Sequence, residues 1–396
     1  MNDVPISANG GSGTSAPFED LEALNLAVIR GEAGGRVIWQ PRILAWYYEQ
    51  LFLKQPLPAP FEGMTLPQIY RTLGCSNRIY DYYTAFVWED DPRVRVVTTD
   101  VCPDEYETRI ETPVGVYTAR YRKAETTSWH VPIKWPVTNE QEMRAAAWRY
   151  EHMTVRFDRE KYDAIRREWA GLGVPCSYFP RTTIQKLFIE DMGTEETVFA
   201  LLDYPAACER YFEALAVMED RFMDALIASP IVSVSFGDNI HSSLTSPEMF
   251  VRYILPVYHR RIERLRPAGK FLHSHWDGNV KPLLPLARET GLDGIEAITP
   301  VPQGDVTLEE VKEALGDMFL LDGIPAVFFD ATYSERDLKE CVQKCLDLFA
   351  PRLILGISDE LSFNGLMERV RLVGEMVEAA APSGGIGAAT ARGSSR

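Results

Sequence analysis

Short apolar runs alternate with longer amphipathic segments through the second half of the chain. Each run is continuously apolar, as expected of a strand that is buried on both faces, and the segments between the runs have helical periodicity. The predicted strands cover residues 173–179, 231–236, 270–275, 294–298, 318–321 and 353–356. Strands that alternate with helices form right-handed βαβ units, so the pattern predicts a parallel sheet.

Several of the segments between these strands carry helix start signals. Ser246 precedes a proline, which places an N-cap residue before a proline at the first helical position. Thr307 and Glu310 have the spacing of a capping box, and Ser334 with Asp337 is a related pair. These signals support helices between the predicted strands.

The first half of the chain is less regular. We expect a helix near 19–31, a strand at 36–41, and a β-hairpin within 93–122 that turns around residues 112–115. With at least one more strand in 130–170, the number of strands approaches the eight of a (β/α)8 barrel. A doubly wound open sheet is the rival, but no predicted strand is followed by a GxGxxG sequence or a P-loop.

The expected organisation is therefore one α/β domain over residues 18–380, a (β/α)8 TIM barrel. Residues 18–170 form its N-terminal elaboration, which includes the β-hairpin. Residues 1–17 and 381–396 are rich in small and weakly polar residues, so we expect both segments to be disordered tails.

Composition narrows the class of partner. The 396 residues carry a formal net charge of −16 and contain no basic run, so we expect no nucleic-acid partner and no anionic membrane surface. No apolar stretch is long enough to span a membrane, and the N-terminus lacks the features of a secretory signal. Six scattered cysteines without a CxxC pair fit a reducing, cytoplasmic compartment.

Polar residues follow the predicted strands at the positions where a barrel carries its chemistry, the C-terminal strand ends. Five successive strand ends carry an ionisable group, and that recurrence points to an active site. The residues at these ends are Arg42, Asp238, His273, His275, Glu296, Asp322, Ser358, Asp359 and Glu360.

A metal site is one interpretation of these strand ends. His273 and His275 are two apart on one strand, so both side chains point to the same face. Glu296 on the next strand and Asp359 further round could supply oxygen ligands, and such a set is ordinary for catalytic Zn²⁺. In the alternative interpretation one histidine forms hydrogen bonds inside the barrel mouth, the other contacts substrate, and no metal is bound.

We assign substrate contacts to Arg42, Trp39, Trp46, Tyr47 and Asp322. The aromatic residues either pack the N-terminal layer against the barrel or form a lid over an apolar substrate. Arg42 either clamps a carboxylate or is structural. The sequence leaves both pairs of alternatives open.

At these residues the chain resembles the uroporphyrinogen decarboxylase superfamily. The resemblance is clearest in residues 245–250, 255–258, 273–275 and 291–293, and in the opening strand 37–39 that is followed by Arg42. It implies a (β/α)8 barrel. The superfamily contains the decarboxylase and zinc-dependent methyltransferases that pass methyl groups to or from corrinoid proteins.

Departures from the family pattern favour one branch. Trp46 stands where the decarboxylase has its second arginine, and Ser358 stands where it has a late histidine, so a porphyrinogen is a poor substrate candidate. The methyltransferases use a His-x-Cys pair and a later Cys. Here His275 replaces the first Cys, and only Ser358 or Asp359 is present at the late position.

The resemblance therefore implies a zinc-dependent methyltransferase of O-demethylase type. An all-nitrogen-and-oxygen zinc site is a hard Lewis acid suited to an ether oxygen, so we expect a methoxylated small molecule, of aromatic type, as the substrate. The methyl group would pass to a corrinoid carried by a separate protein. His273, His275, Glu296 and Asp238 are the expected catalytic residues.

The alternative function is a uroporphyrinogen-decarboxylase-like lyase that acts on a smaller carboxylated substrate through Arg42 and Asp238. A non-catalytic barrel is a third hypothesis, and five ionisable strand ends argue against it. Whether the chain forms a homodimer is left open.

Overall fold

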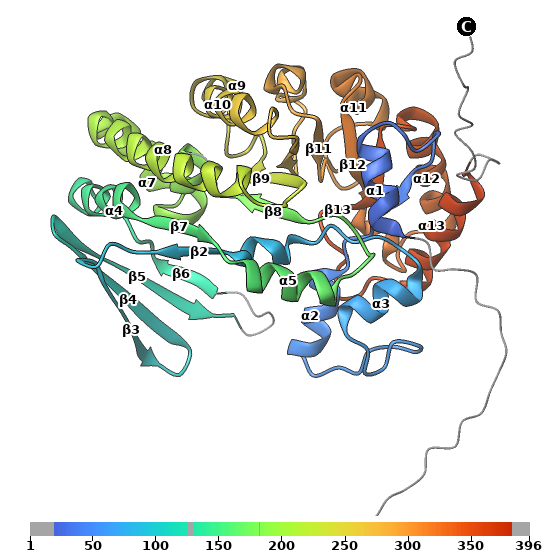
Figure 1. Cartoon of the computed structure of the whole chain (residues 1–396), viewed down its shortest axis with the longest axis horizontal. Helices are drawn as coiled ribbons and strands as arrows, with labels where there is room; N and C mark the ends of the chain where they lie inside the picture. Colours follow the sequence, from blue (N-terminus) through green and yellow to red (C-terminus); the bar gives the residue numbers. More distant parts are fainter. Residues whose placement is uncertain (1–19, 125–129, 182, 382–396) are drawn as a thin grey trace, which may run out of the picture.

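The computed structural model describes residues 20–124, 130–181 and 183–381 (Figure 1). The predicted tail 1–17 therefore lies outside the described residues, as does the predicted tail 381–396 except for its first residue. Within the described ranges, the chain forms a parallel sheet that is wrapped by helices, and a separate antiparallel sheet projects from one side (Figure 1).

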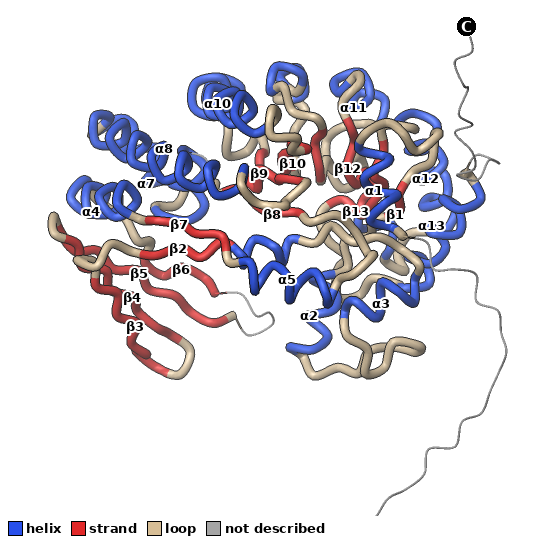
Figure 2. Tube along the Cα trace, viewed as in Figure 1, coloured by secondary structure: helices blue, strands red, loops and turns tan. Residues whose placement is uncertain are grey.

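The parallel sheet of the described residues has seven strands, in the order β1-β13-β12-β11-β10-β9-β8 (Figure 2). Every adjacent pair is parallel. The order follows the sequence and never reverses, unlike the order of a doubly wound sheet, so that rival interpretation is wrong. The strands are β1 (Ile38–Trp39), β8 (Cys176–Phe179), β9 (Ser233–Ile240), β10 (Phe271–Trp276), β11 (Gly294–Glu296), β12 (Phe319–Pro325) and β13 (Leu353–Ser358).

Residues 75–79 lie between the two edge strands of this sheet. The Ser76 backbone N–H donates to the Trp39 carbonyl of β1 at 3.0 Å. Ile79 forms a parallel bridge with Pro175, just before β8. The segment thus contacts both edges of the sheet, although its hydrogen bonding is too sparse to make it a regular strand.

The prediction that residues 130–170 contain a further strand of the parallel sheet is wrong. Two strands lie there, and both are outside the parallel sheet: β6 (His130–Lys134) belongs to an antiparallel sheet, and β7 (Thr154–Phe157) pairs antiparallel with β2 (Phe86–Glu89). The segment that does lie between β1 and β8 is short and carries polar residues that point inward, so it lacks the apolar run by which the other strands were found.

Helices cover the outside of the parallel sheet (Figure 2). The expected capping boxes are present at Thr307 and Ser334, and the Ser246 side chain accepts from the Met249 backbone N–H. Apolar faces of these helices pack with the strands into one large core. The helices of this layer are α1 (Leu21–Ile29), α2 (Leu44–Phe52), α3 (Leu66–Leu73), α5 (Arg159–Glu168), α6 (Thr183–Lys186), α8 (Pro205–Ile227), α9 (Pro247–Met249), α10 (Leu255–Leu265), α11 (Leu308–Leu315), α12 (Glu335–Phe349) and α13 (Met367–Ala379).

The N-terminal elaboration is a four-stranded antiparallel sheet. Its strands are β3 (Arg95–Cys102), β4 (Glu105–Thr112), β5 (Gly115–Lys123) and β6 (His130–Lys134). The predicted hairpin is confirmed, because β4 and β5 pair through the turn between Thr112 and Gly115. One face packs on α4 (Glu140–His152), which with α7 (Thr194–Asp203) and α8 encloses a second, smaller core.

All six cysteines are free. Among the described helices, none combines the length and the hydropathy that a membrane crossing requires.

Candidate active site

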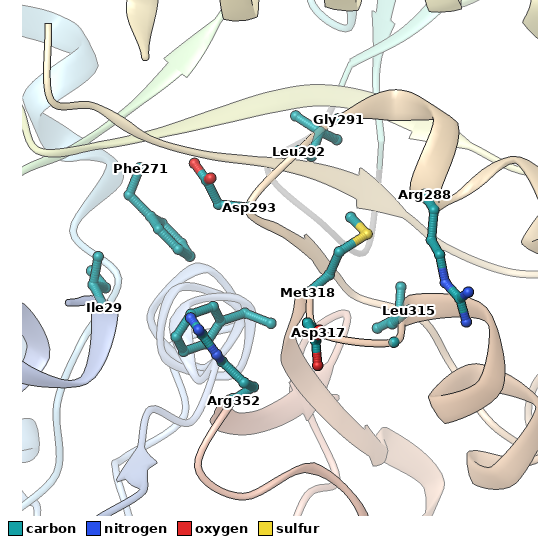
Figure 3. A pocket seen from close by; sticks show the side chains of 12 residues that line it. Ile29, Phe271, Arg288, Gly291, Leu292, Asp293, Leu315, Asp317, Met318 and Arg352 are labelled. Carbon is teal, nitrogen blue, oxygen red and sulfur yellow. The ribbon is translucent and has the colours of Figure 1, made fainter. Parts of the chain in front are cut away.

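A cavity of about 740 Å³ opens at the C-terminal ends of the parallel strands. Its lining includes Arg42, Tyr178, Arg181, His275, Asp359 and Glu360. A second cavity, of about 510 Å³, lies at the opposite ends of the strands, where Phe271 and Phe319 begin β10 and β12 (Figure 3). Since barrel enzymes carry their chemistry at the C-terminal strand ends, the first cavity is the candidate active site.

The backbone is strained around this cavity. Asn239, Ala297, Asp322 and Asp359 have φ values of +51°, +66°, +79° and +69°, in the region that side chains other than glycine rarely adopt. Ala297 and Asp359 directly follow β11 and β13, Asn239 is the last residue but one of β9, and Asp322 lies in the middle of β12. Such residues concentrate at functional sites, because the surrounding structure must hold them in place.

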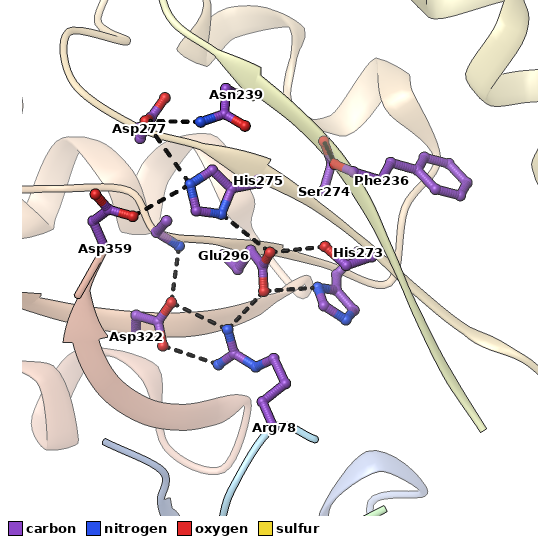
Figure 4. A network of polar contacts seen from close by, with 12 residues as sticks. Arg78, Phe236, Asn239, His273, Ser274, His275, Asp277, Glu296, Asp322 and Asp359 are labelled. Atoms are coloured by element: carbon purple, nitrogen blue, oxygen red, sulfur yellow. Dashed lines mark hydrogen bonds and ion pairs between the residues drawn. The ribbon is translucent and has the colours of Figure 1, made fainter. Parts of the chain in front are cut away.

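Glu296 is the centre of the polar network beneath the cavity (Figure 4). It is fully buried and accepts hydrogen bonds from Arg78 Nη1 at 2.6 Å, Tyr80 Oη at 2.6 Å and Ser235 Oγ at 2.8 Å. His275 Nδ1 lies 3.2 Å from its Oε1. Four donors therefore converge on one carboxylate.

The charge of Glu296 is strongly stabilised. Burial alone would raise the pKa of this carboxyl group, but the neighbouring His273 and Arg78 charges and the hydrogen bond from His275 hold that pKa well below its ordinary value of 4.5. Glu296 is therefore a buried carboxylate at neutral pH.

His275 connects this buried carboxylate to the cavity. It pairs with Glu296 across β10 and β11, and its Nδ1 points toward the carboxylate. Its Nε2 faces the cavity, 3.7 Å from Asp359 Oδ1 and 3.9 Å from Asp277 Oδ2. Burial lowers the pKa of His275, but the hydrogen bond to Glu296 outweighs it and the pKa lies above 6.5. In its protonated form, His275 presents an N–H to the cavity.

Arg42 faces the same part of the cavity. Its side chain is only 10% exposed, and its Nε lies 3.3 Å from Glu360 Oε1. Its Nη2 is 4.0 Å from Asp359 Oδ1. Its Nη1 is buried and makes no hydrogen bond. That atom lies 3.7 Å from Oδ2 of the buried Asp322, so the guanidinium is held among three carboxylates, and its Nη2 is the nitrogen beside the exposed one, Asp359.

Arg78 and Asp322 lie below the cavity and are bound to each other. Arg78 Nη2 and Nη1 donate to the two oxygens of Asp322 at 2.9 and 3.2 Å. The Ala297 backbone N–H also donates to Asp322, at 3.2 Å. A side chain at Gly356 would overlap the Asp322 carboxylate. Asp322 is fully buried, so the structure places it among the supports of the site rather than against a substrate.

His273 and His275 lie on the same face of β10, as the sequence predicts. His273 lies farther from the cavity than His275 and is fully buried. Its Nε2 is 3.0 Å from Ser233 Oγ. Its Nδ1 lies 3.2 Å from Glu296 Oε2 but makes no hydrogen bond there. His273 does not line the cavity, so the structure separates the roles of the two histidines.

Asp238 points away from the cavity, and the structure does not support its predicted catalytic role. It lies on the helix-facing side of β9, where Tyr258 Oη donates to it at 2.8 Å. Tyr258 is also 2.6 Å from Ser274 Oγ, on the outer face of β10. Side chains alternate along a strand, so the inward position of Ser235 already places Asp238 outside.

The predicted aromatic substrate contacts belong to the core. Trp39 stacks on Phe329, with ring centroids 6.5 Å apart, and its Nε1 donates to the Val370 carbonyl. Trp46 is 2% exposed and Tyr47 is 9% exposed, and neither lines the cavity. Of the two interpretations left open, packing of the N-terminal layer is the one that the structure shows.

The predicted zinc ligands are not arranged around a common point. Zn²⁺ needs lone pairs from its ligands at about 2.0–2.2 Å. Both Glu296 oxygens already accept hydrogen bonds, and His275 Nε2 points to the cavity while His273 Nδ1 lies below. Within the described ranges, no three His, Cys, Asp or Glu side chains are placed to hold a metal ion together. In this arrangement, the four predicted ligands do not fit a zinc ion.

Sequence reasoning missed Arg78, Tyr178 and Arg181. Arg78 lies within the irregular segment, residues 75–79, between the edge strands. Tyr178 stacks on Tyr80, with ring centroids 3.8 Å apart, and lines the cavity. Its inward position on β8 could have been found from the alternation of that strand. For Arg78 the only sequence signal is its place before Tyr80 in a polar stretch.

One of the solved structures that match this chain supports the architecture. A methyltransferase from Methanosarcina mazei has a similar solved structure, with a TM-score of 0.52 and 10% sequence identity, over 89% of this chain and 97% of that one. A 3-dehydroquinate dehydratase from Geobacillus kaustophilus matches at a TM-score of 0.30 and 13% identity, over 63% of this chain and 90% of that one. No curated protein matches by sequence.

The first likeness establishes the fold alone, because its sequence identity is low. The family comparison goes further. The sequence pattern of the uroporphyrinogen decarboxylase (URO-D) family matches residues 180–379, about half of the chain. The matched residues include the strands that carry His275, Glu296, Asp322 and Asp359. The chain therefore belongs to the uroporphyrinogen decarboxylase family.

Proposed function

We propose that this protein is a carboxy-lyase that removes CO2 from a small carboxylated compound bound between Arg42 and His275. The observation that carries the proposal is the position of Asp359. Its carboxylate lies 4.0 Å from Arg42 Nη2 and 3.7 Å from His275 Nε2. Two cationic groups are thus spaced to share one carboxylate at the cavity wall.

Asp359 can be replaced there by a ligand. Its side chain is 52% exposed and its backbone is strained at φ +69°, so little burial is lost when it turns outward. A substrate carboxylate in the same place would take over the contacts with Arg42 Nη2 and His275 Nε2. Charge-assisted hydrogen bonds of this kind are the strong ones.

The proposed reaction needs one proton from the protein. The bond between the carboxylate carbon and the rest of the substrate breaks, CO2 leaves, and the electron pair remains on the substrate carbon. The His275 Nε2–H then protonates that carbon, and His275 regains a proton from solvent. Glu296 fixes the ring through Nδ1, which is the arrangement of a general acid oriented by a carboxylate.

The cavity wall suggests the rest of the substrate. Tyr178 is held flat against Tyr80, and Tyr83 and Phe179 also line the cavity. Aromatic faces favour a flat, largely apolar body. The proposed substrate class is therefore a small, flat carboxylic acid that can delocalise the electron pair left by CO2.

We also propose that the parallel sheet is a closed (β/α)8 barrel, in which residues 75–79 take the place of the eighth strand. The support is the Ser76 hydrogen bond to β1 and the Ile79 bridge next to β8. A cytoplasmic location remains a prediction from composition.

Methyl transfer is the second candidate function, because a solved structure of similar fold is a methyltransferase. The buried His273 Nδ1, which lacks a hydrogen-bond partner beside Glu296, is the one atom that favours the predicted zinc ion. This candidate needs a rearranged donor set around His273, His275 and Glu296, a methoxylated substrate, and a separate corrinoid protein.

The experiment that separates the two uses one panel of compounds. Aromatic and unsaturated carboxylic acids, with and without a methoxy group, are incubated with the purified protein in the presence and absence of a reduced corrinoid protein. Release of CO2 without corrinoid is the expected result. Methylcobalamin absorbance without CO2 release would replace the carboxy-lyase proposal with the methyl-transfer proposal.

A further inference from the structure

We infer that Arg78 is a built-in cation that occupies the centre of the acidic cluster and keeps that cluster free of a divalent metal ion. The identity of the cation in this cluster does not depend on whether the reaction releases CO2.

The contacts of Arg78 support a fixed position. Its side chain is 5% exposed. Nη1 donates to Glu296 at 2.6 Å and to Asp322 at 3.2 Å, Nη2 donates to Asp322 at 2.9 Å, and Nε donates to Gln40 Oε1 at 3.0 Å. The guanidinium thus bridges the two buried carboxylates of the strand ends (Figure 4). Gln40 in turn donates to Asn25, at 3.1 Å, so the support extends into α1.

The backbone also places Arg78 by close packing. Gly173 lies so near the Asn77 carbonyl that a side chain at Gly173 would overlap it. The next residues, up to Tyr80, lie between β1 and β8, where Ile79 bridges to Pro175. Arg78 and Tyr80 therefore approach Glu296 together, from the same short segment.

The charges of the cluster explain why Arg78 and a divalent metal ion cannot both occupy it. Two buried carboxylates and two histidines on neighbouring strands carry the oxygen and nitrogen donors that a divalent cation uses, but the ion pairs with Arg78 hold the carboxylates away from a common point. A guanidinium between Glu296 and Asp322 already neutralises them and uses their lone pairs. A divalent ion would meet both a like charge and occupied ligands. Removal of Arg78 should therefore convert an ion-pair centre into a metal-binding centre.

The test is a Zn²⁺ titration by calorimetry, with metal content measured on protein purified without chelator. The wild-type protein is expected to carry under about a tenth of an equivalent of transition metal and to show no stoichiometric Zn²⁺ binding. Arg78→Ala is expected to bind Zn²⁺ at least about tenfold more tightly than the wild type. Its melting temperature should also rise when Zn²⁺ is added.

Three further variants make the result specific. Arg78→Ala combined with Glu296→Gln should lose the gained Zn²⁺ affinity. Arg78→Lys keeps a positive charge and should gain none. Arg336→Ala removes an arginine whose side chain is 81% exposed and should behave as the wild type.

One equivalent of Zn²⁺ in the wild-type protein that is lost in His273→Ala would overturn the inference. A folded Arg78→Ala variant without any gain in Zn²⁺ affinity would overturn it as well. If Arg78→Ala does not fold, the wild-type titration decides alone, because stoichiometric Zn²⁺ uptake contradicts the inference and its absence supports it. CO2 release plays no part in these measurements.

Discussion

Glu296 and Glu219 are both buried carboxylates that are paired with arginine, yet they lie in different surroundings. Glu219, on α8, accepts from Arg260 at 2.6 Å and also pairs with Arg261 on α10. Glu219 and Arg261 are 1% and 0% exposed in their side chains. Arg261 donates to the Pro180 carbonyl at 3.0 Å and lies over the Phe179 ring, so the cluster supports the cavity wall from behind. Neither Glu219 nor the two arginines bound to it line the cavity.

Glu296 has one partner that the other cluster lacks. Besides Arg78, it contacts His275, a titratable group whose second ring nitrogen reaches the cavity. The buried charge at Glu296 therefore acts on a proton that solvent and substrate can reach. Burial and ion pairing therefore do not by themselves mark an active site. What distinguishes Glu296 is its contact with a titratable side chain that faces a cavity.

The sharpest test of this difference is His275→Gln. We expect kcat/KM to fall by about 10²–10⁴, the usual contribution of a general acid, because the variant cannot give up a proton. The measurement is CO2 release under saturating and limiting substrate. His259→Gln on α10, where the ring contacts only the Glu289 carbonyl among the hydrogen bonds of the structure, is the matched control and should keep its rate.

The converse test is Glu219→Gln. Removal of the negative charge leaves Arg261 buried without its counter-ion, and breaking a buried pair in this way costs about 3–5 kcal/mol. Chemical denaturation should show this loss. The kcat of the folded variant should stay unchanged, and a large fall in kcat would show that the two carboxylates are not separate in function.

Arg42→Met should have an intermediate effect. Loss of charged hydrogen bonds to the substrate carboxylate, at about 1.5–3 kcal/mol, corresponds to a rise in KM of about tenfold to a hundredfold. Steady-state kinetics over a range of substrate concentrations would measure it. An unchanged KM would mean that Arg42 serves only Glu360 and Asp359.

The smallest expected effect is a shift in pH dependence. Because the folded-state pKa of His275 lies above 6.5, its charged form contributes stability that is fully present below 6.5 and is lost as pH rises through the raised pKa. The rate should fall over the same interval above 6.5, since the acid form reacts. A rate that instead rises there would assign His275 the role of a base.

The strands and the inward histidine face could be predicted from the sequence, because continuous apolar runs and the two-residue period leave few alternatives. The neighbourhood of His275 and Glu296 followed from their places on successive strands. Trp46 shows the limit of such reasoning: next to Arg42 it suggested a substrate wall, but it is 2% exposed and lies outside the cavity. Its replacement by Ala should therefore cost stability rather than raise KM.

The rest of the site depends on long-range placement. Arg78 is separated from Glu296 by 218 positions, and no local pattern in its polar stretch predicts that contact. Asp238 was placed in the site because it follows a strand, but the alternation along β9 turns it outward. Arg78 was missed because its partners are distant in the sequence, and Asp238 was misplaced because the two-residue alternation of the strand was not applied to it.

Residues 75–79 share few backbone hydrogen bonds with β1 and β8, so the sheet has a weakly paired junction at this segment, which we call the seam. Regular strands share ladders of hydrogen bonds, whereas this segment is held by a few contacts, and segments with fewer such bonds open more readily. Arg78 and Tyr80 are mounted on or beside it, so an opening of the seam would withdraw two donors from Glu296 at once. The fastest amide exchange near the site should therefore come from this segment, and its opening would couple the shape of the barrel to the acidity of His275.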